Sequence, residues 1–116
     1  MDVREIWTPS QDEFDAFAQV SGDDNPIHVD PVFSSETTFG RTVSHGMLIY
    51  TKLWGLILRS RPGTRQISQE MMFPNPTFAG EPVELSISGK APGMLHVCAA
   101  RVADGAELLI GRAEVE

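Results

Sequence analysis

The sequence predicts an α+β protein in which a curved antiparallel β-sheet wraps around one long central helix. Two patterns indicate this arrangement. The stretch from Gly46 to Leu58 is apolar nearly all round, which is typical of a helix buried on every side. Residues 66–116 alternate apolar and polar side chains with a period of two, which is typical of half-buried antiparallel strands. A buried helix needs cover, and we expect these strands to supply it.

The N-terminal part of the chain predicts a short strand and then a short amphipathic helix. Val3 to Thr8 has the pattern of a strand. Ser10 followed by Glu13 is a capping-box pattern, and apolar side chains recur at helical spacing after it. We therefore expect a helix from about Gln11 to Val20, ended by Gly22.

The remaining elements follow from turn and cap residues. Asp30 before Pro31 suits an N-cap and a first helical position, which predicts a short helix from Pro31 to about Thr37. Two prolines make the segment from Gln66 to Phe78 irregular, either bulged or at the edge of the sheet. Strands are expected around Val83 to Ser88 and Leu109 to Glu116. The expected turns between strands are Pro92-Gly93 and Asp104-Gly105.

Length, charge and cysteine content restrict the class of protein. The 116 residues predict a single domain, residues 1–116. A net charge of −7 argues against general nucleic-acid binding, which needs a basic surface. No apolar run is long enough to cross a membrane, so we expect no membrane association. A lone cysteine, Cys98, and the absence of a signal-peptide pattern predict a cytoplasmic location.

A polar, turn-rich segment between two predicted helices contains the main candidates for catalysis. Asp23 and His28 are five residues apart, and the turn residue Asn25 lies between them. An aspartate and a neutral imidazole that converge can hold one water and take its proton. The alternative is a structural role, in which Asp23 and Asn25 only cap the turn and His28 lies on the surface.

The tripeptide Ser44-His45-Gly46 opens the long apolar helix. The first N–H groups of a helix lack partners within it, and glycine lets a ligand approach closely. The Gly46 N–H is therefore a candidate donor to an oxyanion, with Ser44 and His45 as candidate substrate-binding residues. The alternative is that Gly46 is small because the helix packs tightly there. A serine nucleophile is not expected, because no base for Ser44 can be inferred.

Two further sets of side chains are candidate ligand sites. Arg59, Arg61 and Arg65 fall within seven residues and form either a site for a small anion or a solvated basic loop. A metal site would have to combine Asp23, His28 and His45. No recognised ligand spacing is present, so we expect no metal.

Three blocks of sequence closely resemble the MaoC-like dehydratases, which include the (R)-specific enoyl-CoA hydratases. The first block contains Ser21-Gly-Asp-Asp-Asn-Pro-Ile-His-Val-Asp-Pro, and the second contains Val43-Ser-His-Gly-Met-Leu. The third is Phe73-Pro-Asn-Pro-Thr-Phe-Ala-Gly-Glu-Pro-Val. The resemblance runs from about residue 10 to the end of the chain, and the first two blocks are specific in combination.

The resemblance implies a hot-dog fold and a homodimer with sites at the subunit interface. It places Asp23 and His28 on the family's catalytic pair and Gly46 on the glycine whose N–H faces the thioester oxygen. Asn25 falls on its turn asparagine and is a candidate substrate-binding residue. It implies interconversion of trans-2-enoyl and (3R)-hydroxyacyl thioesters, with no cofactor beyond the CoA or phosphopantetheine of the substrate. An acyl carrier protein is a possible partner, and the three arginines are expected to contact CoA phosphates or that protein.

Three alternatives to this activity remain open at the sequence level. A hot-dog thioesterase usually has its carboxylate on the central helix, and Gly46 to Leu58 contains no acidic residue. An acyl-thioester binding subunit would need a second protein for activity. A dehydratase of a secondary-metabolite pathway would need a special substrate. Asp24 stands where the family's bacterial hydratases commonly have an apolar residue, which puts the usual straight-chain substrate in doubt.

Overall fold

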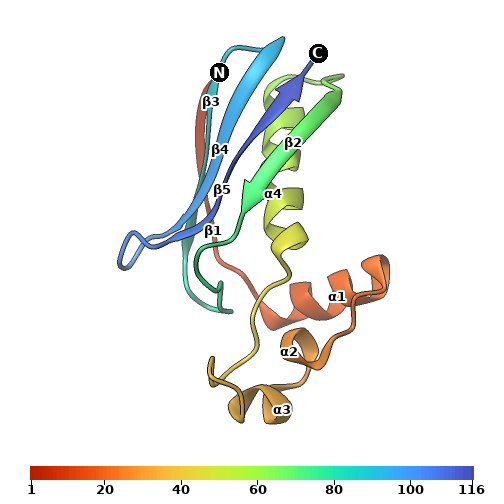
Figure 1. Cartoon of the computed structure of the whole chain (residues 1–116), viewed down its shortest axis with the longest axis vertical. Coiled ribbons are helices and arrows are strands. Elements are labelled where there is room, and N and C mark those ends of the chain that lie inside the picture. The colour runs from red at the N-terminus through yellow and green to blue at the C-terminus, as the bar shows by residue number, and fades with distance from the viewer.

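A five-stranded antiparallel sheet packs against one long helix, and three short helices lie beyond one end of both (Figure 1). The computed structural model describes residues 1–116. Along the chain the elements are β1 (Asp2–Trp7), α1 (Gln11–Ser21), α2 (Pro26–Val29), α3 (Pro31–Ser35), α4 (Gly46–Ser60), β2 (Gln66–Met72), β3 (Val83–Gly89), β4 (Gly93–Arg101) and β5 (Glu107–Val115). The sheet order is β1-β3-β4-β5-β2, so β1 and β2 are its edges.

The caps predicted from sequence account for the short helices. The Ser10 side chain accepts a hydrogen bond from the Glu13 N–H, and the Glu13 carboxylate accepts one from the Ser10 N–H. Gly22 ends α1 with a φ of 80°, a left-handed conformation that glycine adopts without strain. The sequence did not predict α2, because Asn25 and Pro26 suit a turn as well as they suit a helix start.

The predicted alternation of the strands is confirmed in the sheet. Val83, Leu85 and Ile87 of β3 are at most 1% exposed, and they face the core with residues of β4 and β5. The predicted irregular segment is also confirmed, because β2 pairs only with β5 and has a register shift near its start. Pro74 and Pro76 follow β2, where no ladder hydrogen bond is required of them.

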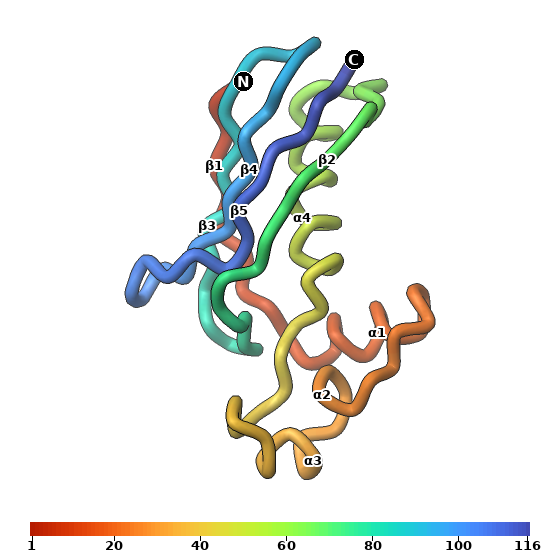
Figure 2. The backbone as a smooth tube through the Cα atoms, in the orientation of Figure 1, coloured from red at the N-terminus to blue at the C-terminus, as the bar shows by residue number.

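The long helix α4 is buried on one face only, which corrects the expectation of burial on every side. Leu53 and Ile57 are fully buried against the sheet, which lies along one side of the helix (Figure 2). Met47, Thr51 and Leu58 are exposed on the other side. A single layer of strands can cover only part of a helix's circumference, so an apolar stripe of α4 remains open. No helix of the chain is both long and apolar enough to span a membrane.

Candidate active site

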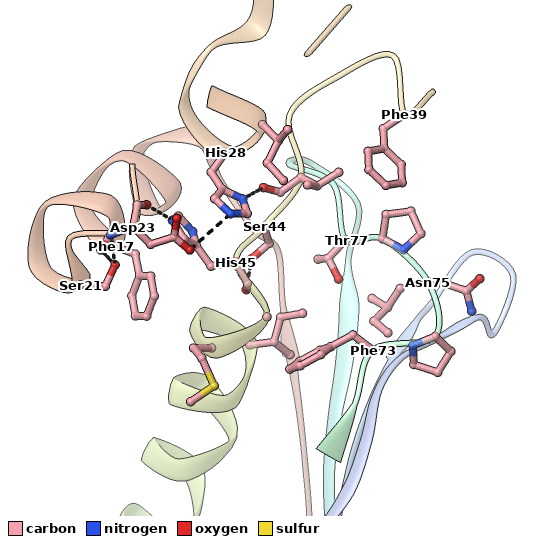
Figure 3. A pocket seen from close by; sticks show the side chains of 18 residues that line it. Phe17, Ser21, Asp23, His28, Phe39, Ser44, His45, Phe73, Asn75 and Thr77 are labelled. Atoms are coloured by element: carbon pink, nitrogen blue, oxygen red, sulfur yellow. Dashed lines mark hydrogen bonds and ion pairs between the residues drawn. The ribbon is translucent and has the colours of Figure 1, made fainter. Parts of the chain in front are cut away.

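A cavity of about 570 Å³ lies where the N-terminus of α4 meets the short helices and the segment after β2 (Figure 3). Its wall is largely apolar, with Phe17, Phe39 and Phe73 among the lining side chains. Its polar lining residues come from three separate parts of the chain: Ser21, Asp23, His28, Ser44, His45, Asn75 and Thr77. The fold therefore brings Asp23, His28 and the start of α4 together, as the sequence predicted.

The tautomer of His28 follows from its hydrogen bond to the backbone. Its Nδ1 lies 2.8 Å from the carbonyl oxygen of Val43, which can only accept, so Nδ1 carries the proton. In the neutral ring, Nε2 is then an unprotonated base. This nitrogen lies 3.6 Å from Oδ2 of Asp23, and the His28 residue is only 8% exposed. Helix α2 thus presents a buried imidazole with its basic nitrogen toward a carboxylate.

The carboxylate of Asp23 lies in the loop that joins α1 to α2. The Asp23 N–H donates to Oγ of Ser21 at 3.1 Å, and Oδ1 of Asp23 accepts from the Asn25 N–H at 3.4 Å. Its side chain is about half exposed and lines the cavity. An ionised carboxylate and a neutral Nε2 are both acceptors, so a water beside them can donate one hydrogen to each. This is the arrangement that a water nucleophile requires.

Two polar residues next to Asp23, Asp24 and Asn25, do not line the cavity. Asn25 is exposed and caps α2, because its Oδ1 accepts from the Ile27 N–H at 3.2 Å. Its side chain stabilises the start of α2 and does not reach the cavity. Asp24 is also exposed and does not line the cavity, so its position gives no reason to doubt a straight-chain substrate.

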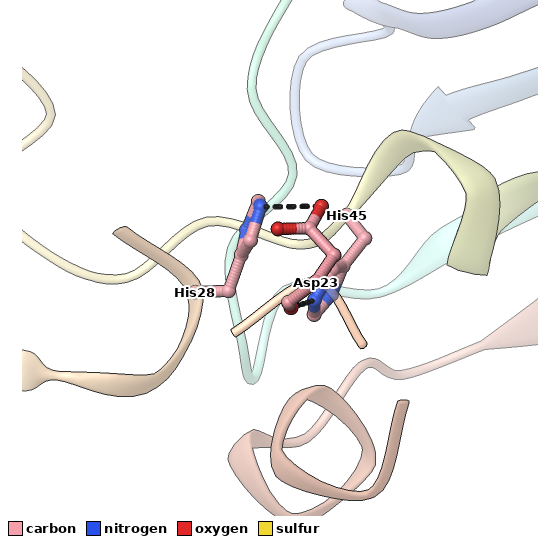
Figure 4. A group of neighbouring side chains, drawn as sticks. All are labelled: Asp23, His28 and His45. Carbon is pink, nitrogen blue, oxygen red and sulfur yellow. Dashed lines mark hydrogen bonds and ion pairs between the residues drawn. The ribbon is translucent and has the colours of Figure 1, made fainter. Parts of the chain in front are cut away.

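His45 is the N-cap residue of α4, and its side chain lies beside Asp23 and His28 (Figure 4). Its ring stacks on that of His28 with centroids 3.8 Å apart, and its Nε2 lies 2.8 Å from the backbone oxygen of Asp23. Burial lowers the pKa of His45, and the nearby His28 lowers it further, although the Asp23 carbonyl and carboxylate act in the opposite direction. The sequence suggested a substrate contact for His45, whereas the structure gives its Nε2 a partner within the protein.

Gly46 is the first residue of α4, and a side chain there would have to displace the ring of Phe73. A Cβ at this position would lie 2.7 Å from ring atoms of Phe73. The N-cap residue of α4 makes no side-chain capping bond, whereas α1, α2 and α3 each have one. The first N–H groups of α4, at the positive end of the helix dipole, are therefore not capped by a side chain at the cavity.

Ser44 and Thr77 complete the polar wall beside Gly46. The Ser44 hydroxyl donates to the backbone oxygen of His45 at 3.0 Å, so its hydrogen already has a partner within the protein. The Ser44 N–H donates to the backbone oxygen of Thr77 at 2.8 Å, and this bond holds the segment after β2 against the start of α4. The Thr77 hydroxyl is buried without a partner. Thr77 and Phe73 were not singled out as site residues, although both fall in the third block of the resemblance.

The three arginines predicted to bind an anion lie away from this cavity. They are at the C-terminal end of α4 and just beyond it, about 20 Å along the helix from Gly46. Arg59 pairs with Glu5, Arg65 with Glu116, and Arg61 donates to Thr64 and to the Glu116 backbone. None of them lines the cavity within this chain. The sequence could not reveal this, because each acidic partner lies some fifty residues away.

The three groups that a metal ion would need are close together but poorly oriented. Ligand atoms of Asp23, His28 and His45 lie within 4.8 Å of one another. The two imidazole rings are stacked at an interplanar angle of 23°, so their nitrogens do not converge on one point. The His45 Nε2 is also occupied by the Asp23 carbonyl. The geometry fits proton transfer better than coordination.

A sheet of this order packed on one long helix defines a hot-dog protein, and here Asp23 and His28 lie near the N-terminus of that helix. The chain belongs to the MaoC like domain family, whose model matches residues 2–105. The (R)-hydratase from A. caviae involved in PHA biosynthesis superposes with a TM-score of 0.90 and 29% identity, covering 100% of this chain and 93% of that one. The hot-dog fold expected from the sequence is thereby confirmed.

Two curated relatives match the chain at the level of sequence. It is 39% identical over 77 residues to the (R)-specific enoyl-CoA hydratase of Aeromonas caviae, a match that covers 65% of this chain and 58% of the relative. It is 32% identical over 81 residues to the mitochondrial 3-hydroxyacyl-[acyl-carrier-protein] dehydratase of Arabidopsis thaliana, covering 70% of this chain and 49% of that protein. The chain therefore spans about half the length of the curated relatives it matches.

Proposed function

We propose that this chain is a hydro-lyase that interconverts trans-2-enoyl and (3R)-hydroxyacyl thioesters. In the hydration direction a water oxygen bonds to C3 of the enoyl group, and a proton is added at C2. The observation that carries the proposal is the pairing of His28 Nε2 with the Asp23 carboxylate, 3.6 Å apart, in the cavity that also contains the start of α4. The names of the two curated relatives agree with this reaction.

Each part of the site has a role in this reaction. Asp23 and His28 accept the hydrogens of one water, orient its oxygen and take up the proton that it loses, and the pair then returns a proton to C2, so that one water is added in total. Negative charge develops on the thioester oxygen as the enolate forms, and the Gly46 N–H at the helix start stabilises that charge. The apolar wall around Phe17 and Phe73 accepts the acyl group and excludes water, which strengthens these interactions.

The proposal includes no cofactor, because addition of water to an activated double bond requires only acid–base groups and an oxyanion donor. CoA or the phosphopantetheine of an acyl carrier protein takes part only as the handle of the substrate. We place the protein in the cytoplasm, where a reducing environment suits the single free thiol of Cys98.

We also propose that two copies of the chain form a homodimer. The edge strand β2 has an unpaired side and exposes Ile67, and α4 exposes Met47 and Leu58. Apolar side chains on a free edge and an open helix face favour pairing with a second copy. Met47 also lines the cavity, so the proposed interface would border the site.

Turnover of crotonyl-CoA tests the activity, with loss of the enoyl-thioester absorbance as the readout. We expect hydration by the wild-type protein and a fall in kcat of at least about 100-fold in Asp23→Asn. Asp24→Asn is a matched control, because it removes the same charge at the adjacent, exposed position outside the cavity. Equal losses in the two variants would contradict the role of Asp23.

The same assay examines His28 and separates the thioesterase alternative. We expect His28→Ala to lose activity as Asp23→Asn does, whereas His96→Ala, an exposed histidine on β4, remains active. Release of free CoA from the substrate would indicate thioester hydrolysis instead of hydration. Binding of the substrate without either reaction would favour a binding subunit.

A further inference from the structure

We propose that His45 is a positioning residue that holds the Asp23 backbone and the His28 ring in their reacting geometry. The inference rests on the proposed function, since it concerns how the catalytic pair is arranged. His45 itself is 3% exposed, and its Nε2 is bonded to the protein, so it acts through its neighbours.

The first argument concerns the loop that carries Asp23. Hydrogen bonds within residues 21–28 connect this loop only to its own neighbourhood, such as those between Asp23 and Ser21 and between Asn25 and Asp23. The bond from Nε2 of His45 to the Asp23 oxygen spans 22 residues, and it is the only hydrogen bond that links residues 22–25 to a distant part of the chain. Bonds from Ile27 and His28 to Val43 hold the end of the loop, and the His45 bond adds a direct connection from the Asp23 backbone to the residue that precedes α4.

The second argument concerns the plane of the His28 ring. The bond from Nδ1 to the Val43 oxygen fixes one edge of the ring but leaves it free to tilt about that bond. The His45 ring lies against its face, 3.8 Å away and nearly parallel. The Phe17 ring meets His45 edge-on with centroids 5.0 Å apart, so His45 is itself held in place. The stack thus sets the direction in which Nε2 of His28 points.

The third argument concerns the remaining nitrogen of His45. Its Nδ1 is buried without a hydrogen-bond partner. Nε2 donates to the Asp23 carbonyl, so in the neutral ring Nδ1 is an unpaired acceptor, which is unfavourable for stability. An apolar ring would fill this space without that disadvantage. The feature that only the imidazole supplies here is the Nε2–H donor to Asp23.

Two substitutions separate the donor from the packing. His45→Phe keeps a flat ring against His28 but removes the donor, whereas the amide nitrogen of His45→Gln reaches about as far as Nε2 and restores the donor. We expect His45→Phe to lower kcat for crotonyl-CoA about 100-fold with KM changed less than about threefold, because misplaced catalytic groups slow the reaction more than they weaken binding. We expect His45→Gln to recover most of kcat, to within about tenfold of the wild type.

Amide hydrogen exchange supplies a readout that does not depend on activity. In His45→Phe the amides of residues 22–25 are expected to exchange faster, while those of the sheet are unchanged, and His45→Gln should restore protection. His96→Phe, on the exposed side of β4, controls for the loss of a histidine. Faster exchange throughout the chain, unchanged kcat and loop exchange in His45→Phe, or a His45→Gln variant no better than His45→Phe would each overturn the proposal.

The two proposals fail in distinguishable ways. If the wild-type protein does not hydrate crotonyl-CoA, the proposed reaction is wrong. Amide hydrogen exchange of residues 22–25 in the two His45 variants then still tests whether His45 positions the loop. If the wild type is active and His45→Phe retains its kcat and loop protection, the proposed function stands and the role of His45 is wrong.

Discussion

The tautomer of His28 is selected by a backbone carbonyl, because the Val43 oxygen lies 2.8 Å from Nδ1 and can only accept a hydrogen bond. The same logic applies to His45, whose Nε2 faces the Asp23 oxygen. Two neighbouring imidazoles therefore carry their protons on different nitrogens. His28 presents its basic Nε2 to the cavity, whereas His45 presents its Nε2–H to the backbone oxygen of Asp23.

The contact between residue 46 and the Phe73 ring can be tested by substitution. Gly46→Ala places a methyl group 2.7 Å from the Phe73 ring, which must shift, although the backbone N–H of residue 46 is retained. We expect a lower kcat in Gly46→Ala and a smaller loss when Phe73→Ala removes the obstructing ring. The coupling from a double-mutant cycle on kcat/KM should be about 1 kcal/mol. Additive effects of the two changes would show that the ring does not limit this position.

Helix α1 is anchored by one carboxylate that joins three elements. The Glu13 side chain accepts from Ser10 in the cap, from Trp7 Nε1 at the end of β1, and from Lys52 of α4 at 2.6 Å. Because α1 also supplies Phe17 to the cavity wall, this junction determines how that wall meets α4. Burial of Glu13 raises its pKa, but the hydrogen bonds from Lys52, Trp7 and Ser10 outweigh that effect, so the pKa is lowered overall.

The lowered pKa of Glu13 predicts a loss of stability in acid. The unfolded chain binds the proton more readily, so the stabilisation is complete above the unfolded value near 4.5 and is lost as the pH falls through the lower folded value. Glu13→Gln is expected to reduce the free energy of unfolding by about 1 to 2 kcal/mol near neutral pH. The difference from the wild type should shrink as the pH falls below about 4. Urea unfolding at both pH values measures this.

Asp12→Asn is the matched control for that comparison, because Asp12 is an exposed acid in the same first turn of α1. It removes the same charge without disturbing the contacts with Trp7 and Lys52. If Asp12→Asn changed the acid dependence as much as Glu13→Gln does, general charge in the first turn would explain the effect instead of the junction.

The whole molecule leaves one side of its central helix uncovered. The sheet protects the face of α4 that carries Leu53 and Ile57, while Met47, Thr51 and Leu58 recur along the opposite face at helical spacing. The strand that follows this helix in the chain, β2, is a free edge of the sheet. A second copy applied here would extend the sheet through β2 and cover the apolar stripe of α4.

A charge placed on that stripe should separate the proposed homodimer. In sedimentation experiments we expect the wild type at about twice the chain mass of 12.7 kDa, and Leu58→Lys near the single-chain mass. The lysine introduces an unpaired charge into an apolar contact, which is strongly unfavourable. Val102→Lys is the control, because Val102 is also exposed but lies in the β4–β5 turn. A wild-type protein that sediments as a monomer would contradict the homodimer.

Much of the architecture could be predicted from the sequence, because helix caps and apolar periodicity are local. The Ser10–Glu13 capping box and the alternation in β3 both specify structure within a few residues. The helix α2 was missed, since Asn25 and Pro26 serve turns and helix starts equally well. The open face of α4 was missed because an apolar pattern does not reveal how many sides of a helix the chain itself can cover.

For the site, the sequence by itself determined which residue types are available and that Asp23, His28 and Gly46 belong to one family pattern. Only the tertiary structure decided their partners: Val43 for His28, the Asp23 backbone for His45, and a distant acid for Arg59. The physical reason is distance along the chain. Each of these contacts joins residues 15 to 54 positions apart, so it forms only when the complete fold brings the two groups together.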